Sequence, residues 1–225
     1  TGQSTERVLE DTRAHNELLI PTITEVLAEA GMEYSDLDAV VTGVGPGPFT
    51  GLRVGMATAS ALADALSIPL HGICTHDAIA HAALDFLPPG GGSIFLDAGT
   101  TINTFAELIS QQYPQAQFNI VSNSLPIALS LAGNGVPDVQ LLGGTVRAIT
   151  QAVVGDTALR TLALMRADVA FIGTNALSVD HGLSTADAQE AAIKTAMVTN
   201  ARRVVVLCDS TKLGNDYVVS FAPLT

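Results

Sequence analysis

The stretch that decides the fold runs from Gly91 to Phe105 and reads GGSIFLDAGTTINTF. A short apolar run, Ile94–Leu96, enters the polar turn Asp97–Thr101, and a helical pattern follows at once. A strand, a turn of small residues and a helix start present backbone N–H groups and the positive end of a helix dipole to an anion. Gly99 lets the backbone approach such a ligand closely. We therefore expect this turn to form one wall of an anion-binding site.

Downstream of this stretch, apolar runs of strand length alternate with helical patterns. We expect strands at 118–122, 139–142, 169–172, 204–208 and 217–221, and helices at 126–132, 157–165 and 190–200. Fully apolar strands separated by helices predict the α/β class, with an open, mostly parallel sheet and helices on both faces.

Ligands of open parallel sheets bind beyond the carboxyl ends of the strands. Five predicted strand ends carry small, polar or charged residues, and one lysine comes from a following helix. These candidate binding residues are Asp97, Gly99, Thr100, Thr101, Asn123, Ser124, Gly143, Gly144, Gly173, Thr174, Asn175, Lys194, Asp209 and Lys212. One such turn is common loop chemistry, but five on one edge indicate a pocket. Lys194 and Lys212 are the only lysines, and a lysine suits phosphate, although a solvated helix position remains the alternative for Lys194.

The segment upstream has a different character. It predicts helices at 15–30, 56–66 and 78–86, strands at 39–41 and 68–73, a Gly/Pro-rich turn at 43–55, and a helix-breaking cluster at 88–92.

Composition and charge limit the classes of function. The chain has 225 residues, of which 48% are hydrophobic and 14% charged, as in a compact globular protein. It contains 10 basic and 22 acidic residues, a net charge of -12. A DNA-binding surface needs a basic stripe, and the only adjacent basic pair is Arg202–Arg203. We therefore expect no direct DNA contact by this chain.

Cysteine usage and hydropathy favour a cytoplasmic protein. Cys74 and Cys208 follow apolar runs, so we expect both to be reduced and buried, and their surroundings show no metal-binding spacing. No stretch reads as a membrane span or a signal peptide. We expect no metal, no cofactor and no membrane contact.

The N-terminal segment resembles a fragment of TsaB, the bacterial scaffold protein for threonylcarbamoyl modification of tRNA. The resemblance rests on His15–Leu19, on Asp36–Val40 and on the string GPGPFTGLRVG at Gly45–Gly55. In that family the two helices that correspond to residues 15–66 form a surface for a partner protein, so the resemblance implies a partner in tRNA modification. The family's opening strands are absent before Arg7. A Gly/Pro turn that merely closes a strand–helix unit is the alternative interpretation of Gly45–Gly55.

Residues from about 81 to 225 resemble the C-terminal effector domain of DeoR-family transcriptional regulators. The strings that carry this resemblance are IFLDAGTT (94–101), NSL (123–125), LLGG (141–144), ADVAFIG (167–173), HGLST (181–185), EAAIK (190–194) and DSTK (209–212). The resemblance implies a fold like that of ribose-phosphate isomerases and a domain that senses phosphorylated sugars. We therefore expect a chimeric chain, with a partial TsaB-like segment at 1–80 and a sensing domain at 81–225.

The resemblance also implies a role for each candidate residue. Gly99, Thr100 and Thr101 would cradle the phosphate; Asp97, Asn123, Thr174 and Asn175 would face the sugar hydroxyls; Lys194, Asp209 and Lys212 would complete the polar rim. Ala176 stands where we expect a glycine after Asn175. The loop 173–177 has no carboxylate that could move a proton, whereas the isomerases carry an acidic cluster there. We therefore expect binding without turnover.

Two further expectations follow from the resemblance. The family's helix-turn-helix is not found before the sensing domain, and the chain stops short of the family's last strand and helix. We expect a homo-oligomer that binds a phosphorylated sugar. A partner-binding scaffold in tRNA modification and a sugar-phosphate isomerase remain as alternative functions.

Overall fold

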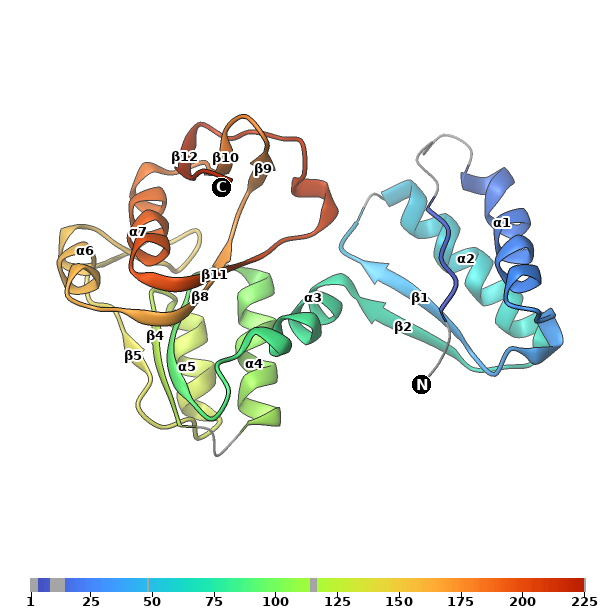
Figure 1. The fold of residues 1–225 in the computed structure, drawn as a ribbon, viewed down its shortest axis with the longest axis horizontal. Helices are drawn as coiled ribbons and strands as arrows, with labels where there is room; N and C mark the ends of the chain where they lie inside the picture. The colour runs from blue at the N-terminus through green and yellow to red at the C-terminus, as the bar shows by residue number, and fades with distance from the viewer. Residues whose placement is uncertain (1–3, 9–14, 48, 114–116, 225) are drawn as a thin grey trace. The chain divides into compact units, whose positions relative to one another are not determined.

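The computed structural model describes residues 4–8, 15–47, 49–113 and 117–224. The chain divides into two compact units, Thr1–Thr75 and His76–Thr225 (Figure 1).

The N-terminal unit is a small strand–helix–strand arrangement. Its elements are α1 (His15–Glu29), η2 (Tyr34–Asp36), β1 (Val40–Gly45), α2 (Phe49–Leu66) and β2 (Leu70–Cys74). β1 and β2 pair in parallel, with Val40 opposite Leu70, and α2 connects them. Helix α2 begins at Phe49, so the predicted start at Met56 is wrong. Gly55 lies inside this helix, where a Cβ would meet only Thr42 Oγ1, at 3.9 Å.

A five-stranded parallel sheet forms the centre of the second unit. The strand order is β11-β8-β3-β4-β5. The strands are β3 (Gly92–Leu96), β4 (Phe118–Ser122), β5 (Gln140–Leu141), β8 (Ala167–Gly173) and β11 (Ala201–Leu207). Ile94 of β3 lies opposite Ile120 on one side and Val169 on the other.

Helices cover both faces of this sheet. They are α3 (Thr75–Ala83), α4 (Thr100–Gln112), α5 (Leu125–Gly133), α6 (Asp156–Ala163) and α7 (Ala188–Thr199), with short 3-10 turns η3 (Leu84–Phe86) and η4 (Ser210–Lys212). Side chains alternate between the two faces of a strand, so Ile94 packs into one core with Phe105 of α4, while Phe95 packs into the other with Leu162 of α6 and Ile193 of α7. The predicted α/β fold, with a mostly parallel sheet covered on both faces, is confirmed.

Local capping explains where two of these helices begin. Ser124 is the N-cap of α5 and accepts a hydrogen bond from the N–H of Ile127 at 3.4 Å. Asp187 is the N-cap of α7 and accepts from Gln189 and Glu190. The second cap starts α7 two residues before the helix predicted from the apolar pattern.

Two small antiparallel additions complete the unit. β9 (Ala176–Ser178), β10 (Gly182–Thr185) and β12 (Val219–Ala222) form a three-stranded sheet in the order β12-β10-β9, and β6 (Thr145–Val146) and β7 (Val153–Val154) form a hairpin. We call the three-stranded sheet the flap. The strand predicted at 217–221 is therefore β12, paired antiparallel in the flap instead of in the parallel sheet. The sequence analysis did not predict β6, β7, β9 and β10, because stretches as short as these do not differ from loop sequence.

The prediction that both cysteines are buried is wrong. Cys74 and Cys208 are free thiols of intermediate exposure. Cys74 is the last residue of β2 and Cys208 follows the last residue of β11, so neither lies in the covered middle of a strand. Among the described residues, no helix combines the length and apolar character needed to cross a bilayer.

Candidate functional site

The carboxyl ends of the five parallel strands bring the predicted binding residues to one edge of the sheet. From β11 to β5, these ends carry Asp209 and Lys212, then Gly173, Thr174 and Asn175, then Asp97, Gly99, Thr100 and Thr101, then Asn123 and Ser124, then Gly143 and Gly144. Neighbouring strands lie about 4.8 Å apart, so the turns after β3, β4 and β8 are immediate neighbours.

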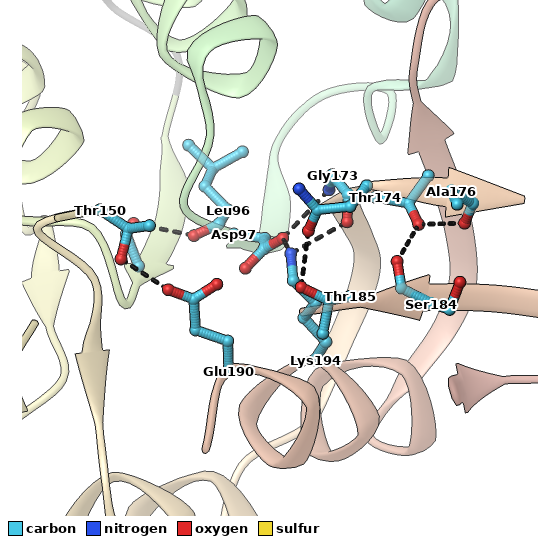
Figure 2. Close-up of polar contacts among 12 residues, drawn as sticks. Leu96, Asp97, Thr150, Gly173, Thr174, Ala176, Ser184, Thr185, Glu190 and Lys194 are labelled. Atoms are coloured by element: carbon cyan, nitrogen blue, oxygen red, sulfur yellow. Dashed lines mark hydrogen bonds and ion pairs between the residues drawn. The ribbon is translucent and has the colours of Figure 1, made fainter. Parts of the chain in front are cut away.

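A buried ion pair lies in the middle of this edge. Figure 2 shows Lys194 reaching from α7 to Asp97 and Gly173. The Lys194 Nζ contacts Asp97 Oδ2 and donates to the carbonyl oxygen of Gly173 at 2.9 Å, and the Gly173 N–H donates to Asp97 Oδ2 at 3.0 Å. Asp97 is 1% exposed and Lys194 5% exposed. The solvated alternative for Lys194 is therefore excluded, because its buried amine contacts both the residue after β3, Asp97, and the last residue of β8, Gly173.

The charge of Asp97 depends on this lysine. Burial raises the pKa of the Asp97 carboxyl, whereas the charge and hydrogen bond of Lys194 and the N–H of Gly173 act to lower it. A carboxylate that is buried and paired in this way is a fixed acceptor. Asp97 Oδ2 is occupied by Lys194 and Gly173.

The turn after β3 leaves backbone donors open. Gly99 is the N-cap residue of α4, has a φ of 156°, and provides no side-chain cap. The first N–H groups of a helix have no acceptor inside it, so those of Thr100 and Thr101 are free to bind an anion. A Cβ on Gly99 would meet only Ile102, at 3.9 Å, so there is open space above the turn.

Asn123, at the end of β4, carries a buried acceptor with no partner. Its side chain is 1% exposed, and its Oδ1 makes no hydrogen bond. The segment around it is held firmly: Ser122 Oγ donates to the Leu96 carbonyl at 2.8 Å and accepts the Ser124 N–H at 3.0 Å. Buried polar atoms are rarely left unpaired, so this atom is a candidate ligand contact.

Thr174 and Asn175 are tied to the flap. The Thr174 hydroxyl lies 2.7 Å from the carbonyl oxygen of Ala176 and 3.0 Å from that of Ser184, and Asn175 Oδ1 accepts from the Thr185 hydroxyl at 2.6 Å (Figure 2). These side chains therefore anchor β10 to the end of β8.

The end of β11 supplies a lysine with no ion pair among the described residues. Asp209 caps η4 and accepts from the N–H and the hydroxyl of Thr211. Burial acts to raise the pKa of Asp209, but these hydrogen bonds and the charge of Lys212 hold it below its ordinary value. Lys212, a residue of intermediate exposure, is therefore a candidate contact for an anion.

Gly143 and Gly144 form the base of the β6–β7 hairpin. Gly144 has a φ of 155°, and a Cβ there would lie 2.5 Å from the carbonyl oxygen of Val154. A Cβ on Gly143 would meet only Thr157, at 4.0 Å. The second glycine is thus required by close packing of the hairpin.

Sequence reasoning missed a polar cluster beside these residues. Arg147, in the hairpin, pairs with Glu190 and with Asp187, the latter at 3.1 Å. The Thr150 hydroxyl donates to Glu190 at 2.6 Å (Figure 2). Glu190 lies one helical turn before Lys194 and therefore on the same face of α7. That i, i+4 spacing was the available signal, but it is also typical of a solvated helix face.

Comparison with known proteins places this unit in a family. Residues 74–225 match the family described as the DeoR C terminal sensor domain. The HTH-type transcriptional regulator GlpR of Haloferax volcanii is 39% identical over 147 residues, which cover 65% of this chain and 56% of that protein. The uncharacterized protein ML0378 of Mycobacterium leprae is 60% identical over 74 residues, which cover 33% of this chain and 21% of that protein. The chain thus spans between about a fifth and about half of the length of these two curated relatives.

Among the solved structures that match, two cover different shares of this chain. Ribose 5 phosphate isomerase A from Neisseria gonorrhoeae matches with a TM-score of 0.44 and 18% identity, over 62% of this chain and 52% of that one. YeaZ from Pseudomonas aeruginosa matches with a TM-score of 0.31 and 36% identity, over 32% of this chain and 34% of that one. TM-scores below 0.5 support no argument about activity, and the comparisons indicate no function in tRNA modification. Through residues 74–225, which make up more than half of its length, the chain belongs to the family of DeoR C-terminal sensor domains.

Proposed function

We propose that residues 76–225 sense a phosphorylated sugar or a related phosphorylated metabolite, binding it without turnover as the input of a transcriptional regulator. The observation that carries this proposal is the unpaired, buried Oδ1 of Asn123. An acceptor in this state calls for an N–H or O–H donor, and a sugar hydroxyl supplies one. The neighbouring turn at Gly99 offers the backbone N–H donors that a phosphate needs.

The phosphate would dock on the first turn of α4. The free N–H groups of Thr100 and Thr101, the helix dipole and the hydroxyls act together on an anion at this position. Lys212 would add a point charge from the end of β11. The sugar would then extend toward Asn123 and the second oxygen of Asp97, across the short distance between the ends of β3 and β4.

Sensing accounts for the site better than catalysis does. The turn Gly173–Leu177 carries no carboxylate, and the Asp97 carboxylate is bound by Lys194. A general base needs a carboxylate that can accept the substrate's proton, which a buried ion pair disfavours. The matched regulator is itself a transcription factor by name.

A thermal-shift screen tests this function. The purified chain is melted with a panel of sugar phosphates, each beside its unphosphorylated sugar. A ligand at 100 times its dissociation constant stabilises by about 2.7 kcal/mol, which raises Tm by roughly 5–10 °C for a unit of this size. We expect a shift only with phosphorylated ligands, and expect Thr100→Ala and Lys212→Ala to reduce it. The proposal fails if no compound raises Tm, or if both variants respond as the wild type does.

Assembly and output belong to the same proposal. We expect the unit to form a homo-oligomer whose geometry changes on ligand binding, because such a change is how a sensor alters an attached DNA-binding domain. Light scattering with and without the ligand measures the assembly. With a net charge of -12, this chain would not contact DNA itself.

A further inference from the structure

The outer strand β11 leaves one edge of the parallel sheet without a neighbouring strand. β11 pairs with β8 on one side, and from Arg203 to Leu207 this register is unbroken. On its other side, no backbone group of residues 202–206 has a backbone hydrogen-bond partner among the described residues. The opposite edge of the sheet is β5, which has only two residues. β11 is therefore the long edge of this sheet, and it presents a row of unpaired N–H and carbonyl groups.

The side chains of β11 are exposed along this edge. Val204, Val205 and Val206 are of intermediate exposure, whereas residues 169–172 of the neighbouring β8 are at most 2% exposed. Both sets pack into the same two cores, so the difference arises because no further strand flanks the valines. Natural edge strands are usually protected by a charge, a proline or a bulge. Residues 204–207 contain no charge and no proline, and their pairing with β8 has no bulge.

The charge pattern of β11 favours a second copy of the same strand as its partner. Arg202 and Arg203 lie at the start of the strand, and Asp209 follows its end. Two copies related by a two-fold axis normal to the sheet pair antiparallel, so the basic end of each strand meets the acidic end of the other. A two-fold axis along the strand would instead pair the copies in parallel, with arginine beside arginine. The strand is therefore complementary to itself only in the antiparallel arrangement.

We propose that β11 pairs antiparallel with β11 of a second copy, centred on Val205, and joins the two five-stranded sheets into one continuous sheet. In this register Arg203 lies opposite Leu207 of the second copy and diagonally from its Asp209, within reach of a long side chain on the same face. The inference rests on the homo-oligomer of the proposed function and names its interface. Asp209 is also a candidate ligand contact, so the interface and the binding site share this residue.

Symmetric cross-linking tests this register. A cysteine at the two-fold axis lies opposite itself, so Val205→Cys, in the full chain with Cys74→Ser and Cys208→Ser, should form a disulfide-linked dimer when oxidised with copper–phenanthroline. Val204→Cys is the matched control, because its own copy would lie diagonally, about 7–8 Å away, which is too far for a disulfide. We expect Val205→Cys to cross-link roughly tenfold faster or more. Equal rates, or no cross-linked dimer, overturn the proposal.

Charge reversal tests the contact between Arg203 and Asp209. Arg203→Glu turns an attraction into a repulsion at both symmetric contacts, so the Kd of the dimer, measured by sedimentation, should rise roughly tenfold. Arg160→Glu on α6 makes the same change in net charge away from the strand edge, and it should change Kd much less. A chain that stays monomeric at every concentration refutes the pairing, and so does an Arg203→Glu variant with the Kd of Arg160→Glu.

Hydrogen exchange on the unmodified chain covers the case in which the variants do not fold. Amides of residues 203–207 that face the open edge should exchange roughly fourfold more slowly at about ten times Kd than at about a tenth of it, because only about a fifth of the chains remain monomeric at the higher concentration. The amides of residues 94–96, in the central strand β3, should not respond. Exchange in β11 that is independent of concentration overturns the proposal. None of these measurements contains a ligand, so their failure leaves sugar-phosphate sensing standing, and a failed thermal-shift screen leaves this interface standing.

Discussion

Replacing Lys194 by methionine should destabilise the second unit more than any surface change. The substitution keeps the length and apolar stem of the side chain but removes the charge that Asp97 contacts. Asp97, at 1% exposure, would keep the Gly173 N–H at 3.0 Å. Breaking a buried pair from one side typically costs about 3–5 kcal/mol, because the remaining charge is left uncompensated.

The pH dependence of this loss has a definite sign. Burial already raises the pKa of Asp97, and removal of Lys194 takes away the main opposing influence, so the pKa rises further in the variant. A carboxyl whose folded-state pKa lies above its unfolded value binds its proton more tightly when folded. Stability of Lys194→Met should therefore fall as pH rises from about 3.8 through the raised pKa. The gap to the wild type should be widest at neutral pH and narrow on acidification.

Urea unfolding at neutral and acidic pH measures both effects, and Asp97→Asn combined with Lys194→Met is the matched double variant. We expect the double variant to recover much of the loss, because a neutral amide needs no counter-charge. A loss below about 1 kcal/mol for Lys194→Met at pH 7 would refute the buried pair, since a solvated lysine on a helix contributes no more than that.

Three further perturbations have expected outcomes. Asn123→Leu should keep or raise stability while it abolishes the thermal shift with sugar phosphates, because it removes an unpaired buried acceptor that serves only the ligand; a variant that melts higher yet still responds would contradict this. Gly144→Ala should cost about 1–3 kcal/mol in urea unfolding, because its Cβ would lie 2.5 Å from a carbonyl oxygen, whereas Gly143→Ala is the tolerated control. Ser93→Ala should raise the pKa of Asp168, which the Ser93 N–H and hydroxyl hold below its usual value. NMR titration should therefore show the wild-type carboxyl protonating at lower pH than that of the variant. A lowered pKa contributes stability above pH 3.8, and this stability is lost as pH falls through the folded-state pKa.

The sequence predicted the sheet because its strands are apolar throughout. Runs such as Ile94–Leu96 can be buried on both sides only between two layers of helices, so the fold class followed from hydrophobicity alone. The place of the candidate site could be predicted as well, since the carboxyl ends of parallel strands lie at the same edge of the sheet. The candidate residues were thus brought to one edge by topology, without any knowledge of side-chain contacts.

What the sequence could not supply is which polar atoms are already paired. The sequence predicted Lys194 as a ligand contact, with a solvated helix position as the alternative, and only the fold shows that its amine is paired with Asp97 at the carboxyl ends of β3 and β8. Thr174 and Asn175 read as ligand contacts, yet much of their hydrogen-bonding capacity holds the flap. The strands of the flap and of the hairpin could not be predicted in full either, because such short strands gain their order from tertiary hydrogen bonds.

Charge sets a further condition on how this site can bind an anion. A chain with a net charge of -12 repels a phosphate at long range, and one of its two lysines, Lys194, is committed to Asp97. Affinity must therefore come at short range, from the neutral N–H groups of the first turn of α4 and from Lys212. Neutral donors are screened little by salt, whereas one lysine gives a weak salt dependence. Binding at this edge should consequently require the phosphate, which these N–H groups and Lys212 hold, and also the fit of hydroxyls to acceptors such as Asn123. The second requirement lets a sensor discriminate one metabolite among many phosphorylated ones.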